Sequence, residues 1–158
     1  MTNAPALNDK APQFSLEADG GRTVALKDYA GQKLVIYFYP KDDTPGCTTE
    51  AIDFTTHIKA FAAANTQIIG VSADSVEKHD KFKAKHNLSV TLLSDPEHTM
   101  LEAYGVWVEK NMYGRKYMGI ERATYLINEA GKIEQIWRKV KVKGHVAAVL
   151  EAAEGNRL

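Results

Sequence analysis

The chain has a single cysteine, Cys47, and the residues before it place its sulfur at the start of a helix. The apolar run 34–39 predicts a buried strand, which leads into a short polar turn. Thr44 and Pro45 then predict a helix start, with a hydroxyl at the N-cap and proline at the first helical position. In the first turn, unpaired N–H groups and the positive end of the helix dipole favour a thiolate over a thiol. The pattern therefore predicts a nucleophilic cysteine.

The charges near Cys47 indicate that such a site needs a cation from elsewhere in the chain. Carboxylates outnumber cations in the local sequence, with Asp42, Asp43 and Glu50 set against Lys41. Left alone, these carboxylates would favour the protonated, inert thiol. Of the five arginines, Arg122 is the best placed, because the apolar strand that follows it would hold it rigidly.

Length and composition predict one globular domain over residues 1–158. A chain of 158 residues buries roughly 70% of its unfolded surface, enough for a core without disulfides. Twenty basic residues balance twenty acidic ones, so charge gives no reason to expect nucleic acid or an anionic membrane as a partner. No apolar run is long enough to span a bilayer, no signal peptide is evident, and one cysteine permits no internal disulfide. We therefore expect a cytoplasmic protein.

Apolar periodicity predicts strands that alternate with helices. A hairpin is expected over residues 14–26, and further strands at 34–39, 67–72, 91–93, 122–127 and 132–138. Helices are expected at 45–63, at 74–86 with Asp74 as N-cap and Glu77 completing a capping box, at 95–103 and at 143–153. This order predicts an α/β sandwich, with a central mixed β-sheet flanked by helices and an N-terminal β-hairpin. Cys47 would lie beyond the carboxyl end of a central strand, where open α/β sheets place their sites.

The remaining polar groups of note receive structural interpretations. The basic run 138–143 alternates like a strand with one solvated face. Trp107 is expected in the core with one edge partly exposed. The histidines lack zinc-binding spacing and are expected at the surface or in helix caps: His57, His79, His86, His98 and His145.

The residues around Cys47 resemble those of a known family. The run Pro40-Lys41-Asp42-Asp43-Thr44-Pro45-Gly46-Cys47 is similar to the peroxiredoxin signature: proline, three residues, threonine or serine, two residues, cysteine. In detail it resembles the bacterioferritin comigratory protein, or peroxiredoxin Q, branch. The segment 122–127 resembles the one that carries the active-site arginine of that family, and the likeness extends from residue 11 to the last helix.

The resemblance implies a thioredoxin-like fold and a peroxidase that needs no metal or organic cofactor. The Cys47 thiolate would attack a peroxide oxygen of H2O2 or an organic hydroperoxide and become a sulfenic acid. Thr44 and Arg122, with nearby backbone N–H groups, would stabilise the charge that moves to the leaving oxygen. Pro40 would cover the sulfur, and Glu50 could orient Arg122.

This chain departs from many members of that branch because it has no second cysteine. The position five residues after Cys47, where many carry a resolving cysteine, is occupied by Ile52. The sulfenic acid must then be reduced by an external thiol: thioredoxin, glutaredoxin with glutathione, or a small thiol. Excess peroxide is expected to drive Cys47 on to sulfinic acid. The branch implies a monomer that binds neither nucleic acid nor membrane.

Two other classes of function remain open at this point. A cysteine hydrolase or acyltransferase would need a histidine beside Cys47 as its base. A non-enzymatic redox sensor on the same fold would form the sulfenic acid but be recycled slowly by any reductant.

Overall fold

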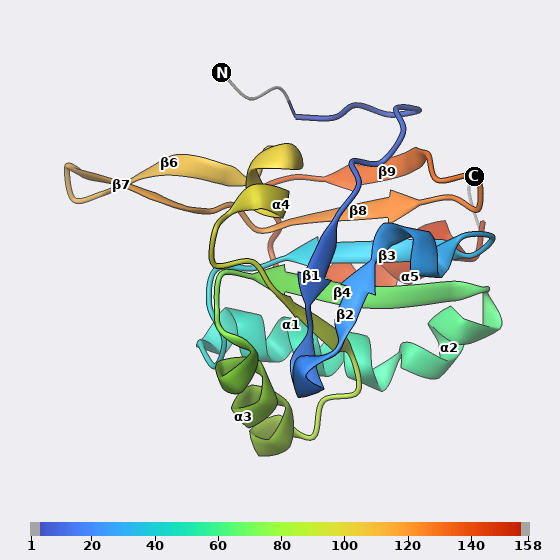
Figure 1. Cartoon of the computed structure of the whole chain (residues 1–158), viewed down its shortest axis with the longest axis horizontal. Helices are drawn as coiled ribbons and strands as arrows, with labels where there is room; N and C mark the ends of the chain where they lie inside the picture. The colour runs from blue at the N-terminus through green and yellow to red at the C-terminus, as the bar shows by residue number, and fades with distance from the viewer. Residues whose placement is uncertain (1–3, 156–158) are drawn as a thin grey trace.

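A computed structural model describes residues 4–155, and its centre is a mixed five-stranded sheet with the order β5-β4-β3-β8-β9 (Figure 1). β3 pairs in parallel with β4, and β4 with β5, whereas β8 runs antiparallel to both β3 and β9. The strands are β3 (Lys33–Phe38), β4 (Thr66–Ser72), β5 (Thr91–Ser94), β8 (Ala123–Ile127) and β9 (Ile133–Trp137). The predicted mixed sheet is therefore confirmed.

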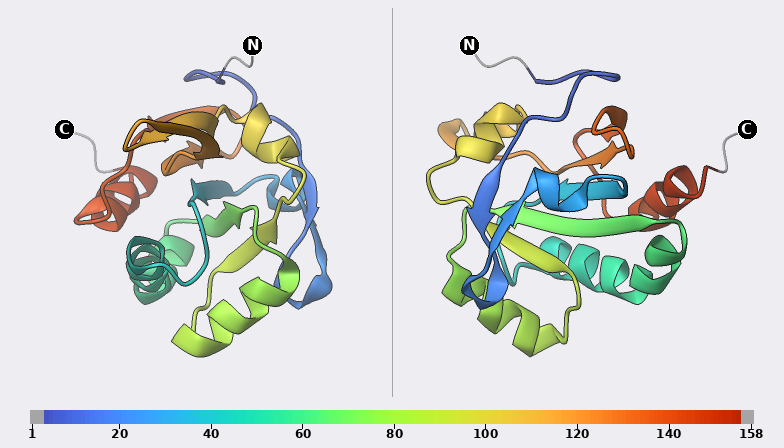
Figure 2. Two further views of the ribbon diagram at one scale, coloured as in Figure 1. Left: turned by 90° about the vertical axis from the view of Figure 1, so that its left-hand side faces the viewer. Right: turned by 45° about the vertical axis from the view of Figure 1, so that its right-hand side comes forward.

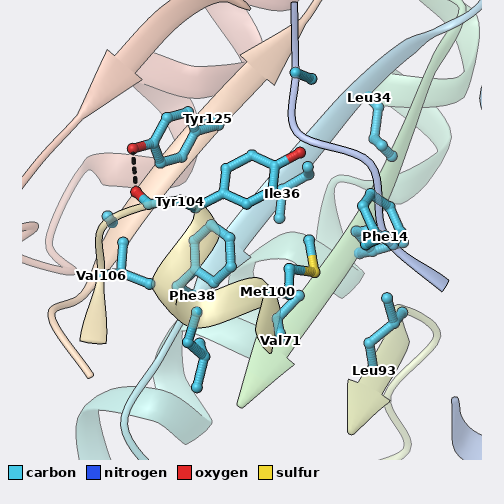
Figure 3. Packing of buried hydrophobic residues seen from close by; sticks show 14 of the residues in the cluster. Phe14, Leu34, Ile36, Phe38, Val71, Leu93, Met100, Tyr104, Val106 and Tyr125 are labelled. Atoms are coloured by element: carbon cyan, nitrogen blue, oxygen red, sulfur yellow. Dashed lines mark hydrogen bonds between the residues drawn. The ribbon is translucent and has the colours of Figure 1, made fainter. Parts of the chain in front are cut away.

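β3 is apolar on both faces because both faces of the sheet are covered. Side chains alternate along a strand, so Leu34, Ile36 and Phe38 enter one buried cluster (Figure 3) while Val35 and Tyr37 enter the other. Four helices pack their apolar residues on the second face: α1 (Pro45–Thr56), α2 (Ile58–Ala63), α3 (Val76–His86) and α5 (His145–Ala153). The first face is covered by α4 (Thr99–Ala103) and by the N-terminal segment (Figure 2).

The predicted N-terminal hairpin is confirmed. β1 (Ser15–Glu17) pairs antiparallel with β2 (Thr23–Ala25). The turn between them is the short helical segment η1 (Asp19–Gly21), in which both glycines have positive φ. A second short helical segment, η2 (Leu26–Tyr29), leads from the hairpin towards β3.

The expected single helix over residues 45–63 is wrong, because the chain breaks at His57 between α1 and α2. His57 leaves the helical region, with φ −100° and ψ 8°. Its ring Nδ1 lies 2.9 Å from the carbonyl oxygen of Asp53, which also accepts the His57 backbone N–H. A side chain that bonds to its own helix backbone in this way competes with the regular ladder. The break leaves Phe54 and Phe61 buried on the same face, so apolar periodicity alone cannot reveal it.

The expected N-cap of α3 is wrong by one residue. Ser75 is the N-cap, and its hydroxyl accepts a hydrogen bond from the Lys78 N–H at 3.2 Å. Asp74 instead points inward, where its Oδ2 accepts from the Ser72 hydroxyl at 2.7 Å and from the Asp42 N–H at 2.8 Å. Asp74 therefore ties two loops together rather than capping a helix.

The sequence analysis did not predict the strands of a projecting hairpin. β6 (Trp107–Met112) and β7 (Arg115–Ile120) pair antiparallel and extend away from the body (Figure 1). Most of their residues are exposed or half-buried, so they lack the continuous apolar run that marks a buried strand. The run 138–143, expected to be strand-like, lies beyond the end of β9 and has no regular structure.

Candidate active site

Cys47 lies in the first turn of α1, with Thr44 as N-cap and Pro45 as the first helical residue. Its side chain points toward the sheet and is only 1% exposed. The Thr44 hydroxyl does not cap the helix. It donates instead to the carbonyl oxygen of Lys41 at 2.8 Å, which fixes the turn before the cysteine. The sulfur is therefore held at a helix N-terminus and shielded from bulk water.

Arg122 reaches Cys47 from the other side of the site. Its Nη2 lies 3.3 Å from Cys47 Sγ, and its Nη1 donates to Glu50 Oε1 at 2.6 Å. The approach follows from the sheet register, because Phe38 at the end of β3 pairs with Ala123 at the start of β8. Gly46 leaves room for the guanidinium, since a Cβ there would lie 3.2 Å from Nη2. Residues 75 positions apart in the chain thus meet at one sulfur.

Glu50 is buried and Arg122 is half-buried, and this burial affects the charge of both groups. Glu50 is fully buried, and this burial raises the pKa of its carboxyl from 4.5 to about 7, against the lowering effect of Arg122. Its second oxygen, Oε2, has no hydrogen-bond partner among residues 4–155. Burial lowers the pKa of Arg122, but Glu50 and Cys47 outweigh it and raise that pKa overall. Arg122 therefore stays charged, while Glu50 can take up a proton near neutrality.

A second carboxylate–cation pair, which is buried, anchors the loop before Cys47. His79 Nδ1 lies 2.6 Å from Asp42 Oδ2, and His79 Nε2 lies 2.8 Å from the Leu93 carbonyl oxygen. The Leu93 carbonyl and the Asp42 carboxylate both accept hydrogen bonds, so this geometry favours a ring with a proton on each nitrogen, an imidazolium. Burial lowers the pKa of His79, but the contacts with Asp42 outweigh it and raise that pKa overall. Asp42 also accepts from the Tyr39 hydroxyl at 2.6 Å.

Two of the histidines expected at the surface or in caps are buried, and neither contacts Cys47. His79 lies on the inward face of α3, three residues before the buried Phe82, and this spacing was the signal that sequence reasoning missed. His145 lies at the start of α5, where its Nε2 is 2.8 Å from Thr124 Oγ1. Burial, with Arg122 nearby, lowers the pKa of His145 to about 4, so this ring is neutral.

The structure gives less support to the roles predicted for the other residues of the site. Pro40 is exposed at the end of β3, so its covering of the sulfur stays a prediction. The predicted role of Thr44 in stabilising the leaving oxygen also stays a prediction, because its hydroxyl donates to the Lys41 carbonyl oxygen. Trp107 is half-buried as expected, stacked on His98 with ring centres 3.8 Å apart.

Two further features are absent from residues 4–155. No group of three or more His, Cys, Asp or Glu side chains there is arranged to hold a metal ion. None of the described helices is both long and apolar enough to cross a membrane.

Comparison with known proteins identifies the family. Residues 7–136 match the AhpC/TSA family, so the chain belongs to that family, which includes the peroxiredoxins. It is 55% identical to peroxiredoxin Bcp of Bacillus subtilis over 145 residues, 92% of each chain. It is 49% identical to peroxiredoxin Bcp of Xanthomonas campestris over 141 residues, 89% of this chain and 88% of the relative.

Solved structures show the same architecture. The bacterioferritin comigratory protein of Xanthomonas campestris, for which alkyl peroxide reduction activity is described, superposes with a TM-score of 0.87 at 48% identity, covering 90% of this chain and 91% of that one. A peroxiredoxin Q mutant from Xylella fastidiosa gives a TM-score of 0.92 at 38% identity, covering 98% of both chains. The thioredoxin-like fold and the resemblance to this branch of peroxiredoxins are therefore confirmed.

Proposed function

We propose that this chain, acting as one domain, is a one-cysteine peroxidase that reduces H2O2 and alkyl hydroperoxides at Cys47. The observation that carries the proposal is the contact of 3.3 Å between the Arg122 guanidinium and a sulfur at a helix N-terminus. A fixed cation at that distance favours the thiolate, which is the nucleophilic form. Family membership and the described activity of the Xanthomonas campestris relative support the same conclusion.

The reaction begins with displacement at oxygen. The Cys47 thiolate attacks the terminal oxygen of the hydroperoxide, an S–O bond forms and the O–O bond breaks. The leaving oxygen departs with the electron pair of the O–O bond and is protonated to water or an alcohol, so sulfur is oxidised to a sulfenic acid. Negative charge moves from sulfur to oxygen, and the Arg122 guanidinium, with free N–H groups of the first helical turn, is placed to stabilise it. We assign Thr44 and Pro40 to positioning the peroxide and limiting water.

The second half of the cycle needs a thiol from another molecule. The chain has one cysteine, so no internal disulfide can form. An external thiol attacks the sulfenic sulfur, releases water and forms a mixed disulfide, and a second thiol then restores Cys47. We propose thioredoxin, or glutaredoxin with glutathione, as the reductant, in a reducing cytoplasm and with the enzyme as a monomer.

The hydrolase alternative lacks its base. Neither buried histidine contacts Sγ: His79 is bonded to Asp42 and Leu93, and His145 to Thr124. A cysteine hydrolase needs a histidine within hydrogen-bond reach of the sulfur. The site therefore favours chemistry at peroxide oxygen.

The test mixes reduced protein with one equivalent of H2O2, using the fluorescence of Trp107 and Trp137 in stopped flow and intact mass after quenching. We expect a fast phase and a gain of one oxygen, both absent in Cys47→Ser. Large excess of peroxide should add a second oxygen, because no internal thiol competes. Oxidation no faster than that of a free thiol would contradict the proposal, and fast oxidation with negligible recycling by any thiol would favour the redox sensor.

A further inference from the structure

The proposed cycle, on which this inference rests, requires a second molecule to reach a buried sulfur. Cys47 is 1% exposed, and its sulfenic acid can be reduced only by a thiol from outside the chain. That molecule must touch the surface that surrounds the site. The most prominent feature beside the site is the β6–β7 hairpin, whose second strand ends two residues before Arg122 (Figure 1).

One face of the hairpin is defined by its register. Lys110 pairs with Tyr117, and Met112 pairs with Arg115. Opposed residues, and residues two apart on a strand, share a face. We call this set the hairpin face: Val108, Lys110, Met112, Arg115, Tyr117 and Gly119.

Lys110 extends along the hairpin face toward the base of the hairpin. Gly119 has no side chain, so the Lys110 chain can lie back over it, with Cδ 3.2 Å from the place a Cβ would take. This direction leads away from the tip and toward the base of the hairpin, because Gly119 pairs with Val108. Burial lowers the pKa of Lys110, as does repulsion from Arg122, while Cys47 raises it. The Lys110 side chain is thus directed toward the end of the hairpin from which the chain continues to Arg122.

The tip of the hairpin exposes residues of the kind found in protein interfaces. Tyr113 is fully exposed, and Met112, at 56%, and Tyr117, at 41%, are exposed apolar side chains beside the Arg115 guanidinium. These four residues line a hollow of about 550 Å³. Aromatic residues, methionine and arginine are enriched in protein–protein interfaces. Exposed apolar groups gathered at one place mark an interaction site.

The charges on this surface favour an acidic partner. Within residues 4–155, neither Lys110 nor Arg115 forms an ion pair, whereas the neighbouring Lys116 lies 3.8 Å from Glu109. Unpaired cations on a protein surface attract a partner of opposite charge and raise the rate of encounter. A protein partner would cover the apolar tip of the hairpin, whereas a small thiol would leave it exposed.

We propose that the hairpin face, with Tyr113 at its tip, is the docking surface for a protein reductant whose reactive cysteine is bordered by acidic residues. The partner thiolate attacks the sulfenic sulfur of Cys47, the S–O bond breaks, and the hydroxyl leaves as water after taking a proton. The mixed disulfide that forms is then cleaved by a second thiol of the partner, which is oxidised while Cys47 is restored.

The experiment compares a protein reductant with a small one on the same sulfenic acid. Protein oxidised by one equivalent of H2O2 is mixed with reduced bacterial thioredoxin or with dithiothreitol, and the two second-order rate constants are expressed as a ratio. The test variant is Tyr113→Asn with Arg115→Gln, since asparagine tolerates the positive φ of 53° at residue 113. The matched control is Lys27→Gln with Lys132→Gln, two exposed lysines beside the turn at the opposite end of β8.

We expect the thioredoxin-to-dithiothreitol ratio to fall about tenfold in the test variant, with a weaker salt dependence of the thioredoxin reaction. The control should keep the ratio within about twofold. An unchanged ratio in the test variant would overturn the proposal, as would an equal loss with both reductants. So would a wild-type sulfenic acid that glutathione reduces and thioredoxin does not. Failure of the wild type to form a sulfenic acid would instead contradict the peroxidase function itself.

Discussion

Two carboxylate–cation pairs have their carboxylates close to Cys47 in the chain, Asp42 before it and Glu50 after it, and they differ in which hydrogen-bond donors stay available. Glu50 with Arg122, and Asp42 with His79, each have a contact of 2.6 Å. Arg122 uses one terminal nitrogen for the carboxylate and keeps the other for the sulfur at 3.3 Å. His79 uses both ring nitrogens on Asp42 and on the Leu93 carbonyl.

This difference in available donors gives the two pairs different roles, one in the reaction and one in supporting the fold. A guanidinium has donors in a fixed fork, so one carboxylate does not exhaust it, whereas an imidazolium has only two donors. The Glu50–Arg122 pair can therefore act on the sulfur directly. The Asp42–His79 pair holds the loop before Cys47 to α3 and β5, and it has no donor left for a substrate. We expect the first pair to control reactivity and the second to control stability.

Replacement of Arg122 should have the largest effect. Arg122→Gln removes the cation beside Sγ, and we expect the rate constant for oxidation by H2O2 to fall at least about 100-fold, measured by stopped flow. The control is Arg138→Gln, which breaks the exposed ion pair with Glu121 at 2.7 Å and should leave the rate within about twofold. Equal rates in the two variants would remove Arg122 from the mechanism.

Replacement of Glu50 should have an intermediate effect on the rate. Glu50→Gln keeps the shape but loses the charge that orients Arg122, and we expect the oxidation rate to fall about tenfold.

The same variant should alter the pH dependence of stability. The pKa of Glu50 is raised from 4.5 to about 7 in the folded protein, so the folded state binds the extra proton. Its contribution to stability is present below pH 4.5 and is lost as the pH rises toward 7. Urea denaturation across this window should show a decline in the free energy of unfolding, and Glu50→Gln should flatten it. An identical decline in both proteins would refute this assignment.

Replacement of His79 should affect stability more than reactivity. His79→Gln leaves Asp42 as a buried charge without its cation, and we expect a loss of about 3 kcal/mol in the free energy of unfolding. His86→Gln, which breaks a more exposed pair with Asp43 on the same helix, should cost less than about 1 kcal/mol. Similar losses in both variants would contradict the supporting role of the buried pair.

The charge on His79 also predicts a pH dependence of stability, which here arises from an ion pair rather than from burial. Its pKa is raised above 6.5 in the folded state by Asp42. The stabilisation is therefore complete below pH 6.5 and is lost as the pH rises through the raised folded value. Denaturation midpoints of the wild type should fall over that range, and those of His79→Gln should not. Parallel pH profiles for the two proteins would show that folding does not raise the pKa of His79.

The two pairs also show what the sequence can and cannot reveal. The place of Cys47 at a helix start follows from local residues, because Thr44 and Pro45 define that start by their own chemistry. Arg122 could be chosen among the arginines because an apolar strand follows it, and the family resemblance supported that choice. Its contact with Cys47 itself depends on the register of β3 with β8, which local residues do not reveal. The fold class followed from the alternation of strands and helices.

The Asp42–His79 pair escaped prediction because its members lie 37 residues apart and each has an ordinary local interpretation. Asp42 appears in a polar turn, and His79 in a helix rich in charged residues. Asp74 was misplaced for a related reason: its carboxylate could equally cap α3, and only the tertiary contact with Asp42 decides against it. Residues whose partners come from distant segments are beyond the reach of local patterns.

The most direct test is the rate of sulfenic acid formation in Arg122→Gln and His79→Gln, measured side by side with H2O2 at pH 7. The account predicts a fall of at least about 100-fold for the first variant and a change within about threefold for the second. A loss as large in His79→Gln, in protein shown to be folded, would contradict the claim that reactivity resides in the Glu50–Arg122 pair.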